Sequence, residues 1–502
     1  MKNRAASRRL PDTYDPYSAI ANGDFEEAAE QAARTPGRAS RLLLADLALR
    51  ERRPEDAIDL LSRWRAHGDE ETDARRNLLL ATAFERVGLH ERAEELYALT
   101  LPRTGGWALE NQRLHFRALG AWIRGEHDRA KELLEEQRQD RHLAYGLGRD
   151  LLAWIDVAAR KYDDAADRFV EALDAFESME VPDQSARSNS VLGLAVIVVE
   201  TIDLRYSERL RVECDRLPWN EGTRRRLFHA GHYLVRLDAL VGNDDDAFTR
   251  ATNLLRSSQR DGELLMSHVT LAEFFRVRGD RVSPPFHLRS ARDALRSERW
   301  SSTDVDDAMA ALLFAVEASH VDQPAAAEAL TRVLSSSGRT DAMLAFEHDS
   351  RARALAFFAR GRVAIAQGHD RDGEELVGRA RGLWADHGYR YRVALADLEL
   401  ADTFENRAAL EASRATLADV PRSWLAKRAE SVQRRLTSGL ADLSPAERRV
   451  LRELRAGKTN REIAETLQKS ESTIRNQTQH IFDVLGINSR AALVARLSEL
   501  YG

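Results

Sequence analysis

Four polar side chains recur along one short stretch near the C-terminus, namely Arg475, Asn476, Gln479 and Asp483. At about 100° per residue they share one side of a helix, with His480 beside them. The forked guanidinium of Arg pairs with guanine, and the carboxamide of Asn or Gln pairs with adenine, along the major-groove edges of DNA. Such a helix can read bases, although an ordinary solvated helix face would show the same pattern when viewed alone.

The other side of the same stretch must face a core. Ile474, Thr478 and Ile481 recur there at helical spacing. Ser470 can cap the start of the helix, and Gly486 can end it. The pattern therefore predicts a rigid helix between these two residues, with its polar row turned outward.

Two shorter helices are predicted before it, each opened by a capping box. Ser444 and Glu447 form the first box, with proline at the first helical position, and Thr459 and Glu462 form the second. Gly457 ends the first of these helices. Three short helices in quick succession are typical of a helix-turn-helix, whose third helix enters the major groove. This frame favours DNA recognition over a solvated face.

The stretch from Leu443 to Arg496 resembles the DNA-binding domain of LuxR-type (GerE-like) bacterial transcription regulators. The residues that carry the resemblance at fixed spacing are Leu443, Ser444, Glu447, Val450, Leu451, Gly457, Asn460, Glu462, Ile463, Ala464, Leu467, Ser470, Thr473, Asn476, Leu485, Gly486, Ser489 and Arg490. It implies that Arg475, Asn476 and Gln479 approach bases.

The same resemblance implies two further roles. Asn460, Ser470 and Thr473 are expected near the phosphate backbone, and a fourth helix at about 489–500 is expected to form a dimer contact. The chain departs from the family at Gln477, where His is common, at Val484, where Lys is common, and at Asn488, where a basic residue is usual.

Those departures remove cations from a segment whose net positive charge is already small. Residues 439–502 hold ten Lys and Arg against eight Asp and Glu, while the whole chain has a net charge of −6. Phosphate contacts supply most sequence-independent affinity for DNA. We therefore expect the domain to bind DNA as a homodimer, with an affinity that falls steeply as salt rises.

The remainder of the chain, from about Tyr14 to Arg435, repeats one helical phrase. A glycine or basic residue ends one helix, acidic residues begin the next, and a small residue follows. These small residues are Ala28, Ala57, Ala93, Ala130 and Ala165, at intervals of 29, 36, 37 and 35 residues. The repeats resemble tetratricopeptide repeats, and their period predicts an α-solenoid of ten or eleven helical hairpins.

The predicted fold is all-α: a tetratricopeptide-like α-solenoid followed by a small four-helix helix-turn-helix domain. We predict a disordered basic tail over residues 1–13, the repeat array over 14–436, a linker over 437–442 and the DNA-binding domain over 443–502. Within the array, Ser283-Pro284-Pro285 predicts an irregular turn.

Composition narrows the function classes. The single cysteine, Cys214, excludes an internal disulfide and a cysteine zinc cluster, which fits a reducing cytoplasm. The longest apolar run, Val191 to Val199, is too short to span a membrane. His229 and His232 have helical spacing for two metal ligands but no third ligand, so no metal and no cofactor are predicted. No catalytic constellation is found, and the protein is not expected to be an enzyme.

A phosphate-binding loop is also missing. Gly457-Lys458-Thr459 is the only candidate, and Arg452 stands where the first glycine of the motif would be. Large LuxR-type regulators often carry an ATP-binding domain before such an array. The resemblance to them therefore covers only their C-terminal portion.

Two functions are consistent with these features. The first is a cytoplasmic bacterial transcription regulator that binds double-stranded DNA, with a protein or small-molecule effector sensed in the groove of the array and RNA polymerase left open as a further partner. The alternative is a helical-repeat interaction scaffold whose C-terminal domain binds DNA weakly or not at all. The uncharged Gln477 and Val484 favour the alternative slightly.

Overall fold

The computed structural model describes residues 16–34, 37–51, 53–64, 70–100, 107–139, 143–179, 182–298, 300, 305–335, 350–437 and 443–501. The predicted tail over residues 1–13 lies outside this range, as do residues 438–442 of the predicted linker. Every regular element in the described residues is helical, as the sequence predicts. The chain divides into two compact units, residues 1–233 and 234–502, with the boundary inside one helix, α13.

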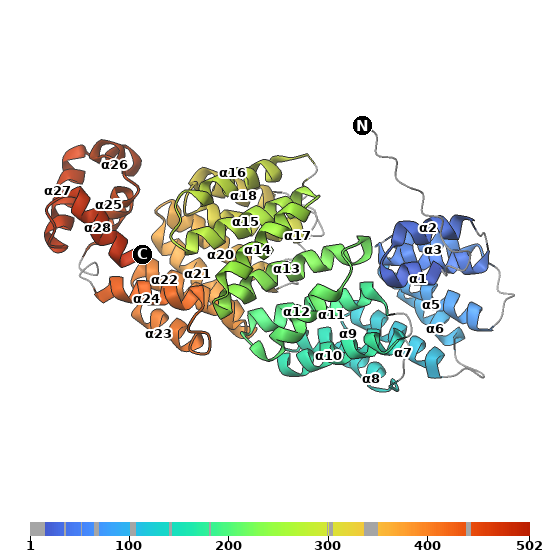
Figure 1. Ribbon diagram of the computed structural model, residues 1–502. Coiled ribbons are helices and arrows are strands. Elements are labelled where there is room, and N and C mark those ends of the chain that lie inside the picture. Colours follow the sequence, from blue (N-terminus) through green and yellow to red (C-terminus); the bar gives the residue numbers. More distant parts are fainter. Residues whose placement is uncertain are drawn as a thin grey trace. The chain divides into compact units, whose positions relative to one another are not determined.

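The first unit holds the early helices of the array, drawn in blue to green in Figure 1. These are α1 (Pro16–Asn22), α2 (Phe25–Arg34), α3 (Arg38–Arg50), α4 (Pro54–Ser62), α5 (Glu70–Arg86), α6 (His90–Leu99), α7 (Trp107–Ile123), α8 (His127–Glu135), α9 (Leu143–Ala158), α10 (Tyr162–Glu177), α11 (Gln184–Glu200), the single turn η1 (Leu204–Tyr206) and α12 (Ser207–Arg216).

The second unit continues the array and ends with the C-terminal domain. Its array helices are α13 (Glu221–Val241), α14 (Asp244–Ser257), α15 (Asp261–Val277), α16 (Ser283–Arg296), α17 (Val305–Ala318), α18 (Gln323–Ser335), α20 (Ser350–Ala366), α21 (Asp370–Asp386), α22 (Arg390–Phe404), α23 (Arg407–Thr416) and α24 (Trp424–Thr437). Across the described residues the array forms eleven successive helix pairs followed by α24, in agreement with the predicted number of hairpins.

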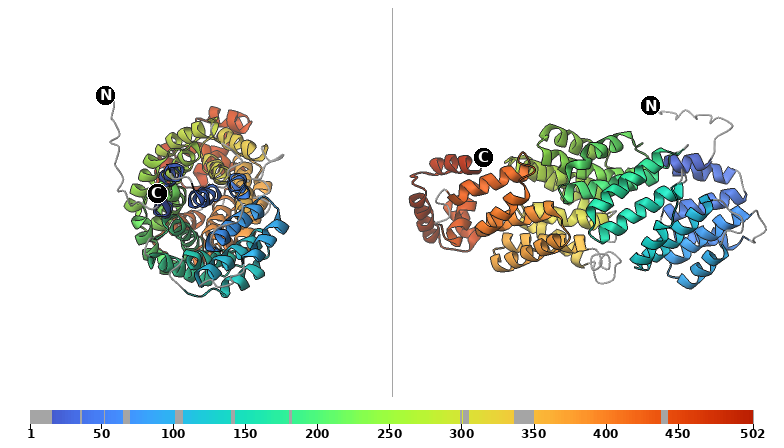
Figure 2. Two further views of the ribbon diagram at one scale, coloured as in Figure 1. Left: turned by 90° about the vertical axis from the view of Figure 1, so that its right-hand side faces the viewer. Right: turned by 90° about the horizontal axis from the view of Figure 1, so that it is seen from below.

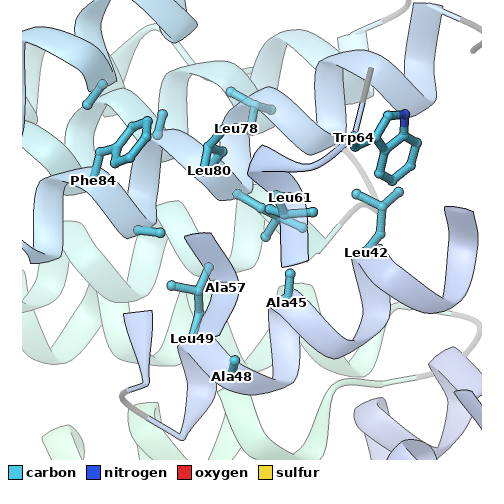
Figure 3. Close-up of a cluster of buried hydrophobic side chains, with 14 of the residues drawn as sticks. Leu42, Ala45, Ala48, Leu49, Ala57, Leu61, Trp64, Leu78, Leu80 and Phe84 are labelled. Carbon is cyan, nitrogen blue, oxygen red and sulfur yellow. The ribbon is translucent and has the colours of Figure 1, made fainter. Parts of the chain in front are cut away.

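The repeated alanines lie where two helices of a hairpin touch. Ala28, Ala57, Ala93, Ala130 and Ala165 all have no exposed surface. A methyl side chain allows the two backbones to approach closely, and larger apolar residues fill the space on either side. Figure 3 shows one such core, in which residues from α3, α4 and α5 meet around the alanines.

In several hairpins, the residue two positions before the second helix adopts a left-handed backbone. Gly23, Gly88, Gly125 and Gly242 have φ between 79° and 86°, and Arg160 takes the same place in one hairpin with φ of 63°. This conformation costs little for glycine and more for a residue with a Cβ atom. The repeated phrase thus ends one helix and redirects the chain into the next.

Within the array, the first helices of neighbouring hairpins pack against one another. In the first unit α3 contacts α5, α5 contacts α7 and α7 contacts α9. In the second unit α15 contacts α17, α17 contacts α20 and α22 contacts α24. We call α15, α17, α20, α22 and α24 the inner layer of the second unit; Figure 2 shows the paired helices of this unit in yellow to orange.

Each unit also brings distant parts of the array together. In the first unit the Gly222 N–H donates to the carbonyl of Gly23 at 2.8 Å. A Cβ atom on Gly222 would lie 2.6 Å from the Gly23 Cα, so this approach requires glycine. In the second unit Lys427 Nζ of α24 lies 3.4 Å from Asp244 Oδ2 of α14. In both units the stack of hairpins therefore curves back on itself.

One local prediction is wrong. Ser283-Pro284-Pro285 does not form an irregular turn but begins α16. The first residues of a helix have no intrahelical acceptor for their N–H groups, so prolines that lack this group are tolerated there. The two prolines therefore fix the start of a helix.

Candidate nucleic-acid interface

The C-terminal helices form a domain with its own core. They are α25 (Pro445–Arg455), α26 (Asn460–Leu467), α27 (Glu471–Val484) and α28 (Arg490–Tyr501). We call residues 443–501 the helix-turn-helix domain. Its buried apolar residues are Leu443, Val450, Leu451, Leu454, Ile463, Ala464, Ile474, Ile481, Leu493 and Leu497. All four helices contribute to this core, which fixes how α27 is presented.

Both predicted capping boxes are present. The Glu447 Oε2 accepts from the Ser444 N–H at 2.8 Å, and the Ser444 Oγ accepts from the Glu447 N–H at 3.3 Å. Thr459 and Glu462 make the same pair of bonds at 2.7 and 3.3 Å. These bonds satisfy backbone donors that the first turn of a helix leaves open.

The capping bonds also shift the acidity of the two glutamates. Burial alone would raise the pKa of Glu447, but its bonds from Ser444 and the charge of His480 more than offset this and lower it. Bonds from the backbone and side chain of Thr459 lower the pKa of Glu462. Both carboxylates thus favour the ionised form.

The helix ends show one feature that the sequence did not reveal. Gly457 and Gly486 end α25 and α27 with φ of 81° and 64°, as predicted. The turn between α26 and α27 uses Gln468 in the same left-handed conformation, with φ of 52°. Lys469 N–H donates to the Ala464 carbonyl at 3.0 Å across this turn. The chain therefore makes the sharp turn of the motif without a glycine.

The two sides of α27 separate as the periodicity predicts. Ile474 and Ile481 have no exposed surface, and Thr478 is buried with them. Arg475, Asn476, Gln479, His480 and Asp483 are exposed on the other side. The three residues predicted to contact bases therefore lie together on the solvent face of one helix.

The contacts of this face are local and solvent-exposed. Gln479 Nε2 donates to Asp483 Oδ1 at 2.9 Å, and Arg475 lies 3.5 Å from Glu471 Oε1. Exposed pairs four residues apart on a helix contribute only about 0.3–0.5 kcal/mol. The guanidinium and the carboxamide can therefore leave these partners for groups on DNA at little cost.

The three residues predicted near the phosphate backbone lie around the starts of α26 and α27. Ser470 caps α27, and its Oγ accepts from the Thr473 N–H at 3.1 Å. Thr473 is exposed, and Asn460 is partly buried. Asn460 Oδ1 accepts from Arg490 at 2.7 Å. Hydroxyl and amide donors at helix N-termini suit phosphate oxygens.

Two residues that the sequence analysis did not identify for this role hold the motif together. Arg490, at the start of α28, donates to the Lys458 carbonyl and to Asn460, both at 2.7 Å. His480 Nδ1 of α27 lies 2.7 Å from Glu447 Oε1 of α25. Both contacts join residues about 30 positions apart, so no local sequence pattern could indicate them.

A four-helix domain with a capped, outward-facing polar helix defines a helix-turn-helix DNA-binding domain. Residues 441–497 match the family model of the bacterial regulatory proteins of the LuxR family, GerE. This part of the chain is thus a LuxR-family DNA-binding domain, and the resemblance seen in its sequence is confirmed. This domain identifies the general class of the protein, which is a transcription regulator.

Most of the chain also aligns with a solved structure. The crystal structure of the apo form of RapI aligns with a TM-score of 0.42 and 11% sequence identity, covering 80% of this chain and 99% of that chain. No curated protein matches the sequence.

Two further features of the described residues concern membranes and metals. None of the helices there combines the length and the apolar character needed to cross a membrane. Within the same residues no group of three or more His, Cys, Asp and Glu side chains is arranged to hold a metal ion. His229 and His232 have the spacing of two metal ligands in the sequence. In the structure His232 is buried, and its ring centroid lies 4.7 Å from that of Phe228.

Proposed function

We propose that this protein is a sequence-specific regulator of transcription whose repeat array senses a protein or small-molecule signal. The observation that carries the proposal is the solvent face of α27, where Arg475, Asn476 and Gln479 project from a rigid, capped helix of a LuxR-family domain. In this proposal the three side chains read base edges. Each good bidentate contact discriminates against a wrong base by about 1–3 kcal/mol.

Phosphate contacts would set the position of that helix. Asn460, Ser470 and Thr473 lie at the starts of α26 and α27, the helix ends that favour anions. Because these contacts depend on charge and position more than on base sequence, they contribute affinity without specificity.

The outer side of α28 supports a homodimer on DNA. Leu493 and Leu497 are buried in the domain core, whereas Ala491, Val494 and Ala495 are exposed beside them. This small apolar strip can pair with the same strip of a second copy around a two-fold axis. Two domains related in this way would bind an inverted repeat. We place this activity in the cytoplasm, with RNA polymerase as a possible protein partner.

Contacts within the second unit link the array to the helix-turn-helix domain. Arg448 lies 2.9 Å from Glu405, and Arg449 lies 3.2 Å from Asp370, in both cases joining α25 to the array. The helix α28 also packs against α24, the last helix of the array. The α27 face is left exposed. A signal that changes the array can therefore bias the DNA-binding domain through these contacts.

Genome-wide recovery of DNA bound to the full-length protein tests this function. We expect discrete peaks that disappear when the chain ends at Thr437. They should also disappear in Arg475→Ala and Asn476→Ala. Arg414→Ala, an exposed arginine of α23, is the matched control and should leave the peaks unchanged. Peaks that persist in both α27 variants would disprove the assignment of this face to the major groove.

A protein-interaction scaffold is the second candidate. Gln477 and Val484 supply no charge where the family commonly has basic residues, and Lys469 donates to the Gln477 side chain at 3.3 Å. A DNA affinity that does not change between 50 and 200 mM salt, conditions over which phosphate contacts weaken by several orders of magnitude, would favour this function.

A further inference from the structure

His480 of α27 combines an exposed ring with a fixed anchor. Its side chain is 55% exposed, and its Nδ1 lies 2.7 Å from Glu447 Oε1 of α25. Glu447 is held in turn, because its Oε2 accepts from both the N–H and the hydroxyl of Ser444. In the part of the chain that the structure describes, His480 Nε2 has no hydrogen-bond partner. The ring is therefore held at one nitrogen and available at the other.

The contact with Glu447 fixes which nitrogen of the ring carries a proton. Burial opposes the ionisation of Glu447, but the bonds from Ser444 and the contact with His480 outweigh it and lower the pKa of Glu447. An ionised carboxylate can only accept, so His480 Nδ1 is the donor. Nε2 then carries a lone pair in the neutral ring and an N–H in the protonated ring. The available nitrogen changes from acceptor to donor as the pH falls.

His480 lies on the edge of α27 that also holds Thr473. At about 100° per residue, His480 is about 20° around the helix from Thr473 and about 40° from Asn476. All three residues are exposed. In the proposed binding mode Asn476 reaches a base and Thr473 lies near the phosphate backbone. A helix in the major groove has phosphates along both of its edges, so His480 is placed on the phosphate side.

Two carboxylates are neighbours of the ring. One is Glu447 from α25, and the other is Asp483, three positions further along α27. Asp483 also accepts from Gln479 at 2.9 Å. Other charged residues of α25, α26 and α27 have partners of their own: Arg448 with Glu405, Arg449 with Asp370, Lys458 with Glu453, Arg461 with Glu465, Glu462 with Thr459, Lys469 with Gln477 and Arg475 with Glu471.

The helix-turn-helix domain has little positive charge from other sources. Residues 439–502 hold ten Lys and Arg against eight Asp and Glu, and His480 is their single histidine. Protonation of His480 raises the formal net charge of this segment from +2 to +3. Imidazole is the side chain that ordinarily changes its charge between pH 5 and 8. In this segment, His480 is therefore the side chain that adds a cation for DNA as the pH falls through that range.

We propose that protonated His480, held by Glu447, donates from Nε2 to a phosphate oxygen of DNA, so that DNA binding takes up a proton. In the neutral ring, the Nε2 lone pair would face the phosphate oxygen, and two acceptors repel each other. The protonated ring donates a charge-assisted hydrogen bond instead. The affinity for DNA therefore rises as the pH falls. This contact rests on the proposed regulatory function, and Glu447 serves in it as a positioning residue.

Fluorescence anisotropy of the full-length protein at pH 6, 7 and 8 and constant ionic strength tests the contact. The two probes are a duplex recovered in the genome-wide experiment and an unrelated duplex of equal length. We expect binding about three- to tenfold tighter at pH 6 than at pH 8, the range between an exposed ion pair and a charge-assisted hydrogen bond. The gain should appear with both duplexes, because phosphates are common to all sequences. A gain confined to the recovered duplex would overturn the phosphate assignment.

Variants tie the pH dependence to His480. His480→Gln keeps a polar side chain without a titratable charge, so its affinities at pH 6 and pH 8 should agree within about twofold. His480→Lys stays charged over this range and should bind tightly at both values. His127→Gln, at an exposed histidine of α8, is the matched control and should retain the natural dependence. A dependence in His480→Gln equal to that of the natural chain would overturn the proposal.

Glu447→Gln tests the positioning role. Glutamine also suits a capping box, so the start of α25 is retained, but the anionic acceptor for Nδ1 is lost. The gain between pH 8 and pH 6 should fall by at least about half, and an unchanged gain would remove Glu447 from the contact. Failure of the natural chain to bind either duplex at any pH would refute the regulator and this contact together. Sequence-specific binding whose pH dependence survives in His480→Gln would refute the contact alone.

Discussion

The solvent face of α27 and the buried ion pairs among α20, α22 and α24 use the same kinds of residue in opposite ways. The Arg475 side chain is 73% exposed and lies near a glutamate four positions away. The Arg362 side chain is 7% exposed, and its carboxylate partner lies 37 positions away in the next hairpin. The first guanidinium exchanges its partner for water or DNA at little cost. The second is held by the fold and tolerates little change in charge.

This difference shows how one chain can hold charged side chains in two physically distinct ways. Exposed side chains on a rigid helix keep their hydrogen-bonding groups available for a partner that arrives from solvent. Buried ionic side chains in a packed array make each charge depend on the charges around it. A change in one of these charges therefore affects the packing of several helices.

The largest expected effect comes from removing a shared carboxylate in the inner layer. Glu399→Gln leaves Arg362 and Arg428 without their common anion and should lower the free energy of unfolding by about 3–5 kcal/mol. Urea unfolding monitored by circular dichroism measures it. Glu411→Gln, in an exposed pair with Arg414, is the matched control and should cost less than about 1 kcal/mol. Equal costs would remove the contrast between buried and exposed charges.

The next effect concerns the α27 face. Arg475→Ala or Asn476→Ala should each weaken binding to the operator by about 1–3 kcal/mol while leaving binding to unrelated DNA nearly unchanged. Fluorescence anisotropy with both DNA types, at one stated salt concentration, measures this selectivity. The unfolding free energy should stay within about 0.5 kcal/mol of the natural chain, since both side chains are exposed. A parallel loss on both DNA types would instead assign these residues to the phosphate backbone.

An effect of similar size, on stability and not on binding, is expected at the contact that joins α28 to the α25–α26 turn. Arg490→Ala removes hydrogen bonds to the Lys458 carbonyl and to Asn460. The cost should be about 1–3 kcal/mol, because a partly buried carbonyl loses its donor. Thermal unfolding of residues 439–502, which have their own core, measures it. Arg461→Ala, in an exposed pair with Glu465, should change the unfolding temperature much less.

The smallest effect is a dependence on pH. The folded-state pKa values of Glu447 and Glu462 lie below their ordinary value of 4.5. Their contribution to stability is therefore complete above about 4.5 and is lost as the pH falls through the lowered folded values. Urea unfolding of residues 439–502 at pH 7, 5, 4 and 3 should show this decline. Glu447→Gln and Glu462→Gln should each flatten it, and an unchanged slope would contradict the capping assignment.

Local signals in the sequence predicted much of the fold. The capping boxes at Ser444 and Thr459 and the stops at Gly457 and Gly486 involve residues within five positions of each other, so their chemistry is legible in order along the chain. The repeated alanines work in the same way, because each hairpin repeats one local packing requirement. The outward side of α27 followed from periodicity alone, although the base and phosphate roles of its residues stay predictions.

Other features depend on residues that only the folded chain brings together. Gln468 adopts a left-handed backbone that its residue type does not predict, because the contacts around the turn impose it. Arg490 reaches a loop about 30 positions away, and Gly222 meets Gly23 across a whole curved stack of hairpins. An irregular turn was expected at Ser283, but a helix begins there. Proline is common both in turns and at helix starts, so the sequence pattern did not distinguish the two.

The sequence by itself determined the helical repeat, the helix-turn-helix frame and the polar row of Arg475, Asn476 and Gln479. Those features arise from spacing within single helices or hairpins. Only the tertiary structure decided that Arg362, Glu399 and Arg428 share one buried chain of charge. Each comes from a different helix, and the curvature of the array sets which side chains of different helices meet. The spacing of residues within one helix carries no information about which side chains of other helices they contact.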